Sequence, residues 1–258
     1  FSWEKTAKLT LEQIASHRNV NFIPNRPQPT KRLKLAFVSP LPPERSGISD
    51  YSAILLPELS RFYDIDVVIN QENVLDPWIL ANCQVCSTNY FRKHGDDYDR
   101  VIYHFGNSEF HSHMFDLLDE FPGAVVLHDF FLSGVINYMD QQGITENGWA
   151  TALLDGHGYG SLIERFSTDD EDAIVWKYPC NLRVLNDAIG VIVHSEHSKD
   201  LAQDWFGSEI SRKWETIPLM RKASLHDKAI SRKRLGYSDN AKLICSFGAV
   251  TPTKHGVQ

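Results

Sequence analysis

The chain has 258 residues, of which 42% are hydrophobic and 23% are charged, and its formal net charge is −7. The acidic balance argues against nucleic acid as the main partner, because binding to phosphates requires a basic surface. No apolar run reaches the roughly 20 residues that a membrane-spanning helix needs, and the polar, amphipathic first residues are not a secretory signal.

The first predicted element is a helix over residues 1–18, whose apolar residues recur on one face. The stretch "IPNRPQPTKR" follows, and three prolines in so short a polar segment are typical of a linker, here residues 23–32. The linker separates residues 1–22 from the rest of the chain. Such a helix must pack its apolar face on another part of the protein.

Residues 33–222 alternate between strand-like and helical segments. Apolar runs predict strands over 32–38, 64–70, 99–107, 123–129, 190–195 and 214–219, and amphipathic runs predict helices over 49–62, 108–121, 130–139, 196–206 and much of 145–188. The alternation predicts the α/β class, with a Rossmann-like parallel sheet and helices on both faces. A helix over 224–236 and a strand over 241–248 predict the beginning of a second domain in 223–258.

Polar residues follow several predicted strands, at the edge where parallel sheets bind ligands. Gly47 precedes a helix N-terminus and indicates either close approach of an anion or a plain turn. His128 and Asp129 end another strand, and we favour a functional role over a satisfied histidine and a helix cap. His104 and Asn107 hold similar positions, where the functional and the structural interpretation stay equally open.

Other histidine and serine patterns indicate structure rather than chemistry. His111 and His113 lie two residues apart in a predicted helix, so they point to different faces and are expected to be exposed or half-buried. Ser195 is expected to cap the helix that follows it. Lys254, just past the last predicted strand, is by itself best interpreted as a surface lysine, although a lysine there can clamp a phosphate.

The four cysteines are interpreted as reduced thiols in a cytoplasmic protein. Cys83 and Cys86 have the C-x-x-C spacing, which also suits metal or redox chemistry, but no second pair of ligands completes a zinc set. We expect a structural role for this pair, and neither a metal nor a cofactor. Cys245 lies in an apolar run, where a small hydrophobic side chain fits.

Taken in order, these segments resemble the family-4 retaining glycosyltransferases, which have the two-domain GT-B fold. The resemblance runs from about residue 32 to the end of the chain. "KLAFVSPLPPERSGISDYSAILLPEL" is similar to the family's first strand, glycine loop and helix, and "VIYHFGNSEFH" and "AVVLHDFF" are similar to its middle strands. "AIGVIVHSEHSKDLA" is similar to the unit that ends the first domain, and "AKLICSFGAVTPTKHG" to the opening strand and lysine loop of the second.

The resemblance implies transfer of a sugar from a nucleotide diphosphate sugar to an acceptor hydroxyl, with retention, in polysaccharide or glycoconjugate biosynthesis. It implies that Gly47 and Lys254 contact the donor diphosphate and that His128 and Asp129 lie at the transferred sugar. His104 and Asn107 would then bind the acceptor or sugar. The implied acceptor is a saccharide or a lipid-linked saccharide, and the resemblance also allows peripheral membrane contact and a tandem transferase domain.

The ends of the chain suggest how it would be organised. "FSWEKTA" is similar to the opening of the family's last helix, so residues 1–22 are expected to be the end of a preceding transferase unit. Residues 33–222 would form the acceptor-side domain, and residues 223–258 the beginning of a truncated donor-binding domain. We therefore expect this chain alone to be inactive.

Departures from the family pattern leave other functions open. Ala249 stands where the family often has an arginine shortly before the lysine, and the paired glutamates of the donor domain are absent from the sequence. One alternative is a noncatalytic binding or assembly module on the same fold. Another is a nucleotide-sugar epimerase, which needs no acceptor cleft.

Overall fold

The computed structural model describes residues 3–16, 32–219, 226–238 and 240–245. The chain divides into two compact units, Phe1–Arg221 and Lys222–Gln258. Among the described residues, no helix combines the length and the apolar character needed to cross a bilayer.

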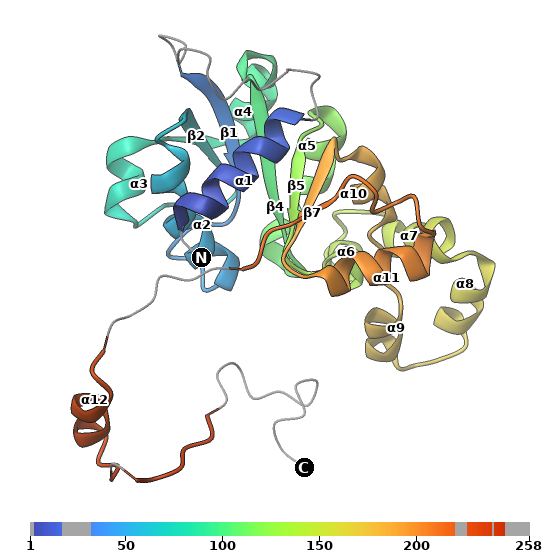
Figure 1. Cartoon of the computed structure of the whole chain (residues 1–258). Helices are drawn as coiled ribbons and strands as arrows, with labels where there is room; N and C mark the ends of the chain where they lie inside the picture. The colour runs from blue at the N-terminus through green and yellow to red at the C-terminus, as the bar shows by residue number, and fades with distance from the viewer. Residues whose placement is uncertain (1–2, 17–31, 220–225, 239, 246–258) are drawn as a thin grey trace. The chain divides into compact units, whose positions relative to one another are not determined.

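A seven-stranded parallel sheet forms the middle of the first unit, in the order β3-β2-β1-β4-β5-β6-β7 (Figure 1). Its strands are β1 (Leu33–Val38), β2 (Tyr63–Ile69), β3 (Gln84–Ser87), β4 (Arg100–Phe105), β5 (Ala124–Leu127), β6 (Gly190–Val193) and β7 (Glu215–Thr216). The central strands are nearly continuous apolar runs, as expected for strands that are buried on both faces. The predicted Rossmann-like α/β architecture is confirmed.

Helices cover both faces of the sheet and form two separate hydrophobic cores. One core is shared with α1 (Trp3–Ser16), α2 (Gly47–Leu59) and α3 (Pro77–Asn82). The helices on the other side are α4 (Thr88–His94), α5 (Met114–Glu120), α6 (Ser133–Gln141), α7 (Gly148–His157), α8 (Tyr159–Phe166), α9 (Glu171–Lys177), α10 (Leu182–Asp187) and α11 (Glu196–Phe206). Two 3₁₀ turns, Gly95–Asp97 and Glu109–His111, complete the set.

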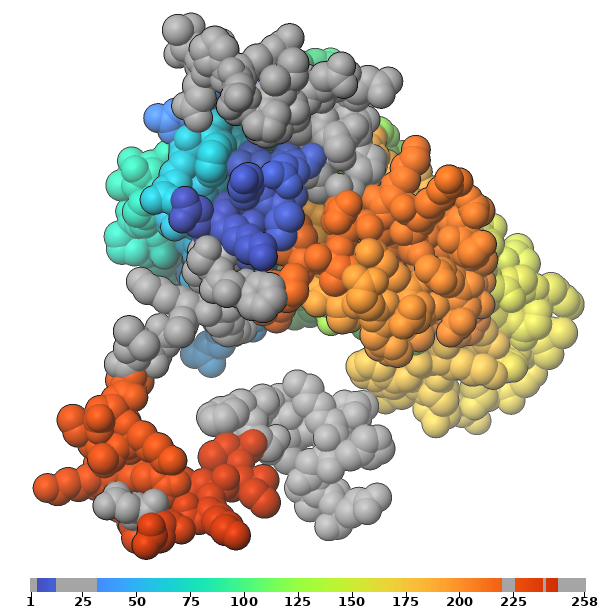
Figure 2. All heavy atoms as spheres, in the orientation of Figure 1, coloured from blue at the N-terminus to red at the C-terminus, as the bar shows by residue number. Residues whose placement is uncertain are grey.

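Helix α1 packs against α2 and β6 and so extends the helical layer on this face. Figure 2 shows its surface in dark blue, beside that of α2. Ala7 is fully buried in the core that it shares with the sheet, and Thr6 and Thr10 are buried beside it. The predicted amphipathic helix thus has its apolar partner within the first unit.

The sequence patterns placed some elements wrongly. Helix α2 begins at Gly47 rather than Ser49, because Ser46 caps it, and the predicted helix over 108–121 is a 3₁₀ turn followed by α5. Helix α3, strand β3 and helix α4 were not predicted. Strand β3 is short and buries only Cys86, so its hydrophobic pattern is weak.

The second unit contains one described helix, α12 (Lys228–Arg234), which Asp227 caps through the N–H of Ile230 at 2.9 Å. The strand predicted over 241–248 is not formed in its described part, 241–245. A strand requires a neighbour with which to pair, and the described residues of this unit include no other strand. Cys245 is accordingly exposed rather than packed as a small hydrophobic residue.

Candidate functional site

A cleft of about 430 Å³ opens at the carboxyl edge of the sheet. The loops after β1 and β4 meet there, at the point where the strand order reverses and where this architecture binds ligands. We call it the edge cleft. It is lined by Arg45, Ser46, Gly47, Ile48, Asn107, Ser108, Phe110, His128, Asp129, His194 and Leu219.

One wall of the edge cleft is the N-terminus of α2. The Ser46 hydroxyl accepts a hydrogen bond from the N–H of Ile48 at 3.2 Å, and Gly47 is the first helical residue. Gly47 therefore does not occupy a positive-φ turn, and that interpretation of the glycine is wrong. The helix dipole and the Arg45 guanidinium both make this wall favourable for an anion.

A short chain of hydrogen bonds joins the loops after β4 and β5. The Asp129 carboxylate accepts a hydrogen bond from the N–H of Asn107 at 2.9 Å, and the Asn107 side-chain oxygen accepts one from the N–H of Val135 at 2.9 Å. Asn107 thus caps the first turn of α6 in addition to lining the cleft. We call this chain the loop clamp.

Gly106 lies within the same loops and has no space for a side chain. A Cβ atom there would lie 2.3 Å from Ile48 Cδ1 and 2.8 Å from His111 Nε2. Close packing of the loop after β4 against α2 therefore requires glycine at this position.

Three histidines at neighbouring strand ends form a hydrogen-bonded row. His104 Nδ1 lies 3.0 Å from His128 Nε2, and His128 Nδ1 lies 3.0 Å from His194 Nε2. Alternation along the strands places all three side chains on the α2 face of the sheet. The ring of Tyr51 in α2 covers the row, with centroid distances of 5.9, 5.0 and 5.5 Å to the three imidazoles.

The end of the row determines where its protons lie. His194 Nδ1 is 2.7 Å from the Ile217 carbonyl, which can only accept, so His194 carries its proton on Nδ1 and accepts with Nε2. His128 must then donate from Nδ1 and accept with Nε2, and His104 must donate from Nδ1. The unprotonated Nε2 of His104 is left buried with no hydrogen-bond partner in the described structure.

Burial keeps the row neutral near pH 7. It lowers the pKa of His104 and of His128 well below the usual 6.5, and the neighbouring histidines add to the effect. Burial also lowers the pKa of His194, although the hydrogen bond to Ile217 opposes this shift. A neutral row is consistent with the tautomers that the hydrogen bonds require.

The structure brings together four of the six residues predicted for the site. Gly47, Asn107, His128 and Asp129 line the edge cleft. His104 is fully buried and reaches the cleft only through its hydrogen bond to His128. Lys254 lies outside the described residues.

The row also restricts what His128 can do. Both of its ring nitrogens are bonded to other histidines, so a ligand can bond to either nitrogen only by replacing one of them. The site prediction omitted His194, Arg45 and the covering Tyr51. For the row, a signal was available in the sequence, since "YHF", "VLH" and "IVH" each place a histidine near the carboxyl end of a strand.

His111 was wrongly expected to be exposed or half-buried, whereas His113 is half-buried, as predicted. His111 is fully buried, and the ring nitrogens of both residues are buried without a hydrogen-bond partner in the described structure. Burial lowers the pKa of His111 to about 4 and that of His113 to about 3. The 3₁₀ turn that replaces the predicted helix turns His111 inward against Gly106.

Ser195 is the N-cap residue of α11, as predicted, although its hydroxyl lies near Ser198 Oγ (3.3 Å) and bonds to no backbone N–H of the helix. Cys83 follows α3, and Cys86 lies in β3. In the described part of the chain, no group of three or more histidine, cysteine or acidic side chains is arranged to hold a metal ion.

No family model matches the chain, and neither curated proteins nor solved structures give a match.

Proposed function

We propose that the chain is the acceptor-side part of a retaining GT-B glycosyltransferase, which transfers a sugar from a nucleotide diphosphate sugar to an acceptor hydroxyl. The observation that carries the proposal is the edge cleft. It combines an anion-binding wall, Arg45 and the N-terminus of α2, with the Asp129 carboxylate and the Asn107 amide. These are the groups that a diphosphate and sugar hydroxyls require.

In this proposal the two walls act on different parts of the reaction. The N-terminus of α2 and Arg45 stabilise the negative charge that develops on the departing diphosphate. The Asp129 carboxylate uses one oxygen on the N–H of Asn107 and retains acceptor capacity for a sugar hydroxyl. His128 and its neighbours keep the floor of the cleft rigid, since their nitrogens bond to one another.

The position of α1 supports the same proposal. In the family that the sequence resembles, the last helix crosses back from the second domain onto the first. Helix α1, which bears the similar sequence motif, packs on α2 and β6 of the first unit, where a helix of that kind belongs. The substrate partners would be a nucleotide sugar and a saccharide or lipid-linked saccharide, at a cytoplasmic site and without a further cofactor.

A pair of glycine variants tests the proposal. Sugar transfer is measured with the complete gene product and a panel of nucleotide diphosphate sugars. Gly47→Leu places a side chain in the edge cleft and should lower the rate by about a hundredfold, while the urea midpoint stays unchanged. Gly160→Leu is the matched control, because Gly160 is also an exposed helical glycine and has open space around it. Equal rates in the two variants would contradict the assignment.

A noncatalytic binding module is the second candidate, and the histidine row favours it. Because both nitrogens of His128 are occupied, the residue best placed for acid–base chemistry is held in a structural role. Calorimetry with the same panel separates the candidates. Saturable binding of a nucleotide sugar or saccharide without turnover of any donor would support the module.

A further inference from the structure

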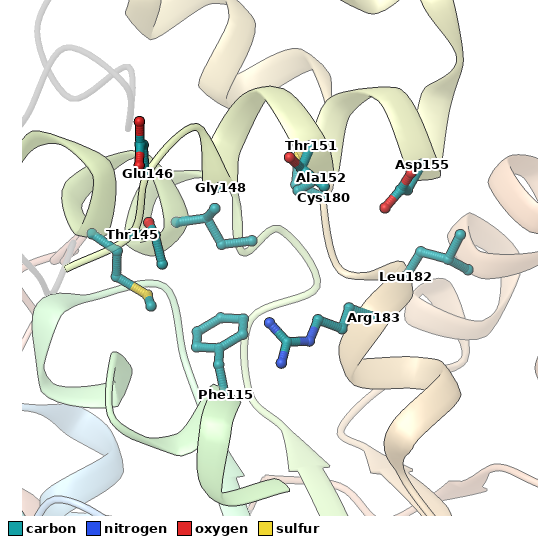
Figure 3. Close-up of a pocket in the computed structure, with 12 residues that line it drawn as sticks. Phe115, Thr145, Glu146, Gly148, Thr151, Ala152, Asp155, Cys180, Leu182 and Arg183 are labelled. Carbon is teal, nitrogen blue, oxygen red and sulfur yellow. The ribbon is translucent and has the colours of Figure 1, made fainter. Parts of the chain in front are cut away.

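A second cavity, of about 280 Å³, lies among α5, α6, α7 and α10, and we call it the helical cavity (Figure 3). It shares no lining residue with the edge cleft. It is lined by Phe115, Ile136, Met139, Thr145, Glu146, Gly148, Thr151, Ala152, Asp155, Cys180, Leu182 and Arg183. The volume is slightly below the roughly 300 Å³ at which pockets for drug-sized ligands begin, so it suits a smaller molecule.

The floor of the helical cavity is apolar. Phe115, Ile136 and Met139 are buried side chains of the main core and present their free surfaces to the cavity. Burial raises the pKa of the Cys180 thiol to about 11, so this group adds an uncharged surface at neutral pH. Such a floor favours a hydrocarbon or aromatic group.

Two opposite charges face the same cavity without pairing with each other. Figure 3 shows the Asp155 carboxylate of α7 and the Arg183 guanidinium of α10 both extending toward its middle. No ion pair joins them in the described part of the chain, and Asp155 has no ion pair there with any other residue. The Asp155 carboxylate is therefore available to a ligand.

Arg183 is only loosely held by the protein. It lies 3.6 Å from Asp119 and 3.7 Å from Asp187, distances that are too long for hydrogen bonds. Burial raises the pKa of Asp187, Arg183 lowers it, and Asp119 raises it. Because both contacts are long, the guanidinium retains donors in a fork geometry that matches a carboxylate.

We propose that the helical cavity binds a free α-amino acid with an apolar side chain. Its carboxylate would meet Arg183, its ammonium group would meet Asp155, and its side chain would lie on the apolar floor. A simple anion would be repelled by Asp155 and Glu146, both of which line the cavity. A simple amine would leave the Arg183 donors without an acceptor.

Calorimetry with three related compounds tests the proposal. L-Phenylalanine has all three groups, 3-phenylpropionate lacks the ammonium group, and 2-phenylethylamine lacks the carboxylate. We expect saturable binding of L-phenylalanine, and affinities for the other two that are weaker by about tenfold or more, the value of one charged hydrogen bond. Absence of phenylalanine binding, or equal affinity for all three compounds, would overturn the proposal.

Variants show whether binding occurs in this cavity. Asp155→Asn and Arg183→Met should each weaken L-phenylalanine binding by about tenfold or more. Arg212→Met is the matched control, because Arg212 is exposed and outside the cavity, and it should leave affinity unchanged. Unchanged affinity in Arg183→Met would place the ligand elsewhere and overturn the proposal. Sugar transfer is not part of this test, so either proposal can fail without the other.

Discussion

In the edge cleft the polar groups of the floor and loops bond to one another, whereas in the helical cavity opposite charges face open space. The hydrogen-bonded groups of the edge cleft are the three imidazoles of the row and the residues of the loop clamp. The opposite charges of the helical cavity are those of Asp155 and Arg183. The difference teaches that a cleft placed by the fold is not automatically a set of free reactive groups. Internal hydrogen bonds rigidify a site, whereas groups that make only long ionic contacts or none remain able to bind a ligand.

Acidification should produce the largest effect on the region around the cleft. Below pH 6.5 His111 and His113 bind protons in the unfolded chain, whereas burial keeps both imidazoles neutral in the folded chain. The free energy of unfolding therefore falls as pH falls and is unaffected above about pH 7. The expected loss at pH 5 is about 2 kcal/mol for each histidine, measured by urea unfolding at pH 7 and pH 5.

A leucine variant checks the source of this pH dependence. His113→Leu should recover about 2 kcal/mol of the loss at pH 5, because it removes one of the histidines whose pKa is lowered by burial. Exposed His197→Leu is the control and should follow the unchanged protein. An identical pH dependence in all three proteins would show that His113 is not the source.

Breaking the row in the middle should have the next largest effect. His128→Leu leaves the His104 donor and the His194 acceptor unpaired, at a cost of about 3 kcal/mol in unfolding free energy. His104→Leu should cost about half as much, because it leaves one unpaired atom and removes Nε2, which already lacks a partner. Urea unfolding of the two variants gives the comparison, and equal losses would argue against the row.

Nitrogen NMR of the imidazole rings checks the row without any mutation. The direction set by the Ile217 carbonyl requires the Nδ1–H tautomer at all three histidines. Observation of an Nε2–H tautomer at His128 would reverse the direction of the row and refute this derivation.

The loop clamp should contribute less than the row. Asp129→Ala removes the acceptor for the N–H of Asn107 and should cost about 1 kcal/mol. Asp129→Asn retains an oxygen that can accept the same hydrogen bond and should cost little. If the two variants lose equal stability by urea unfolding, the charge of Asp129 matters more than the hydrogen bond.

Changes in the helical cavity should have the smallest effect on stability. Asp155→Asn removes a carboxylate that has no ion pair in the described structure, and we expect a change within about 0.5 kcal/mol. Arg183→Met should lose about as little, because its two ionic contacts are long and exposed. If either variant lost as much unfolding free energy as His128→Leu, the contrast between the edge cleft and the helical cavity would not hold.

Much of the architecture was predictable because it depends on local patterns. The apolar runs of β1, β4, β5 and β6 are buried on both faces, so their strands stand out from the sequence. Short β3 at the edge buries one side chain and did not stand out. In the candidate site, the residues after each strand were predictable from the rule for parallel sheets, including Gly47, His128 and Asp129.

The amino-acid sequence by itself determined the alternation of strands and helices and the polar residues at the strand ends. Both follow from the local spacing of apolar and polar residues along the chain. Only the tertiary structure decided that His104, His128 and His194 bond in one row, since this depends on the order β4-β5-β6 and on alternation placing all three on one face. The Ile217 carbonyl, from the segment after β7, then decides which nitrogens hold the protons. The positions of the three histidines near strand ends could be predicted, but their hydrogen bonds could not, because residues so far apart in the chain leave no local pattern of contact.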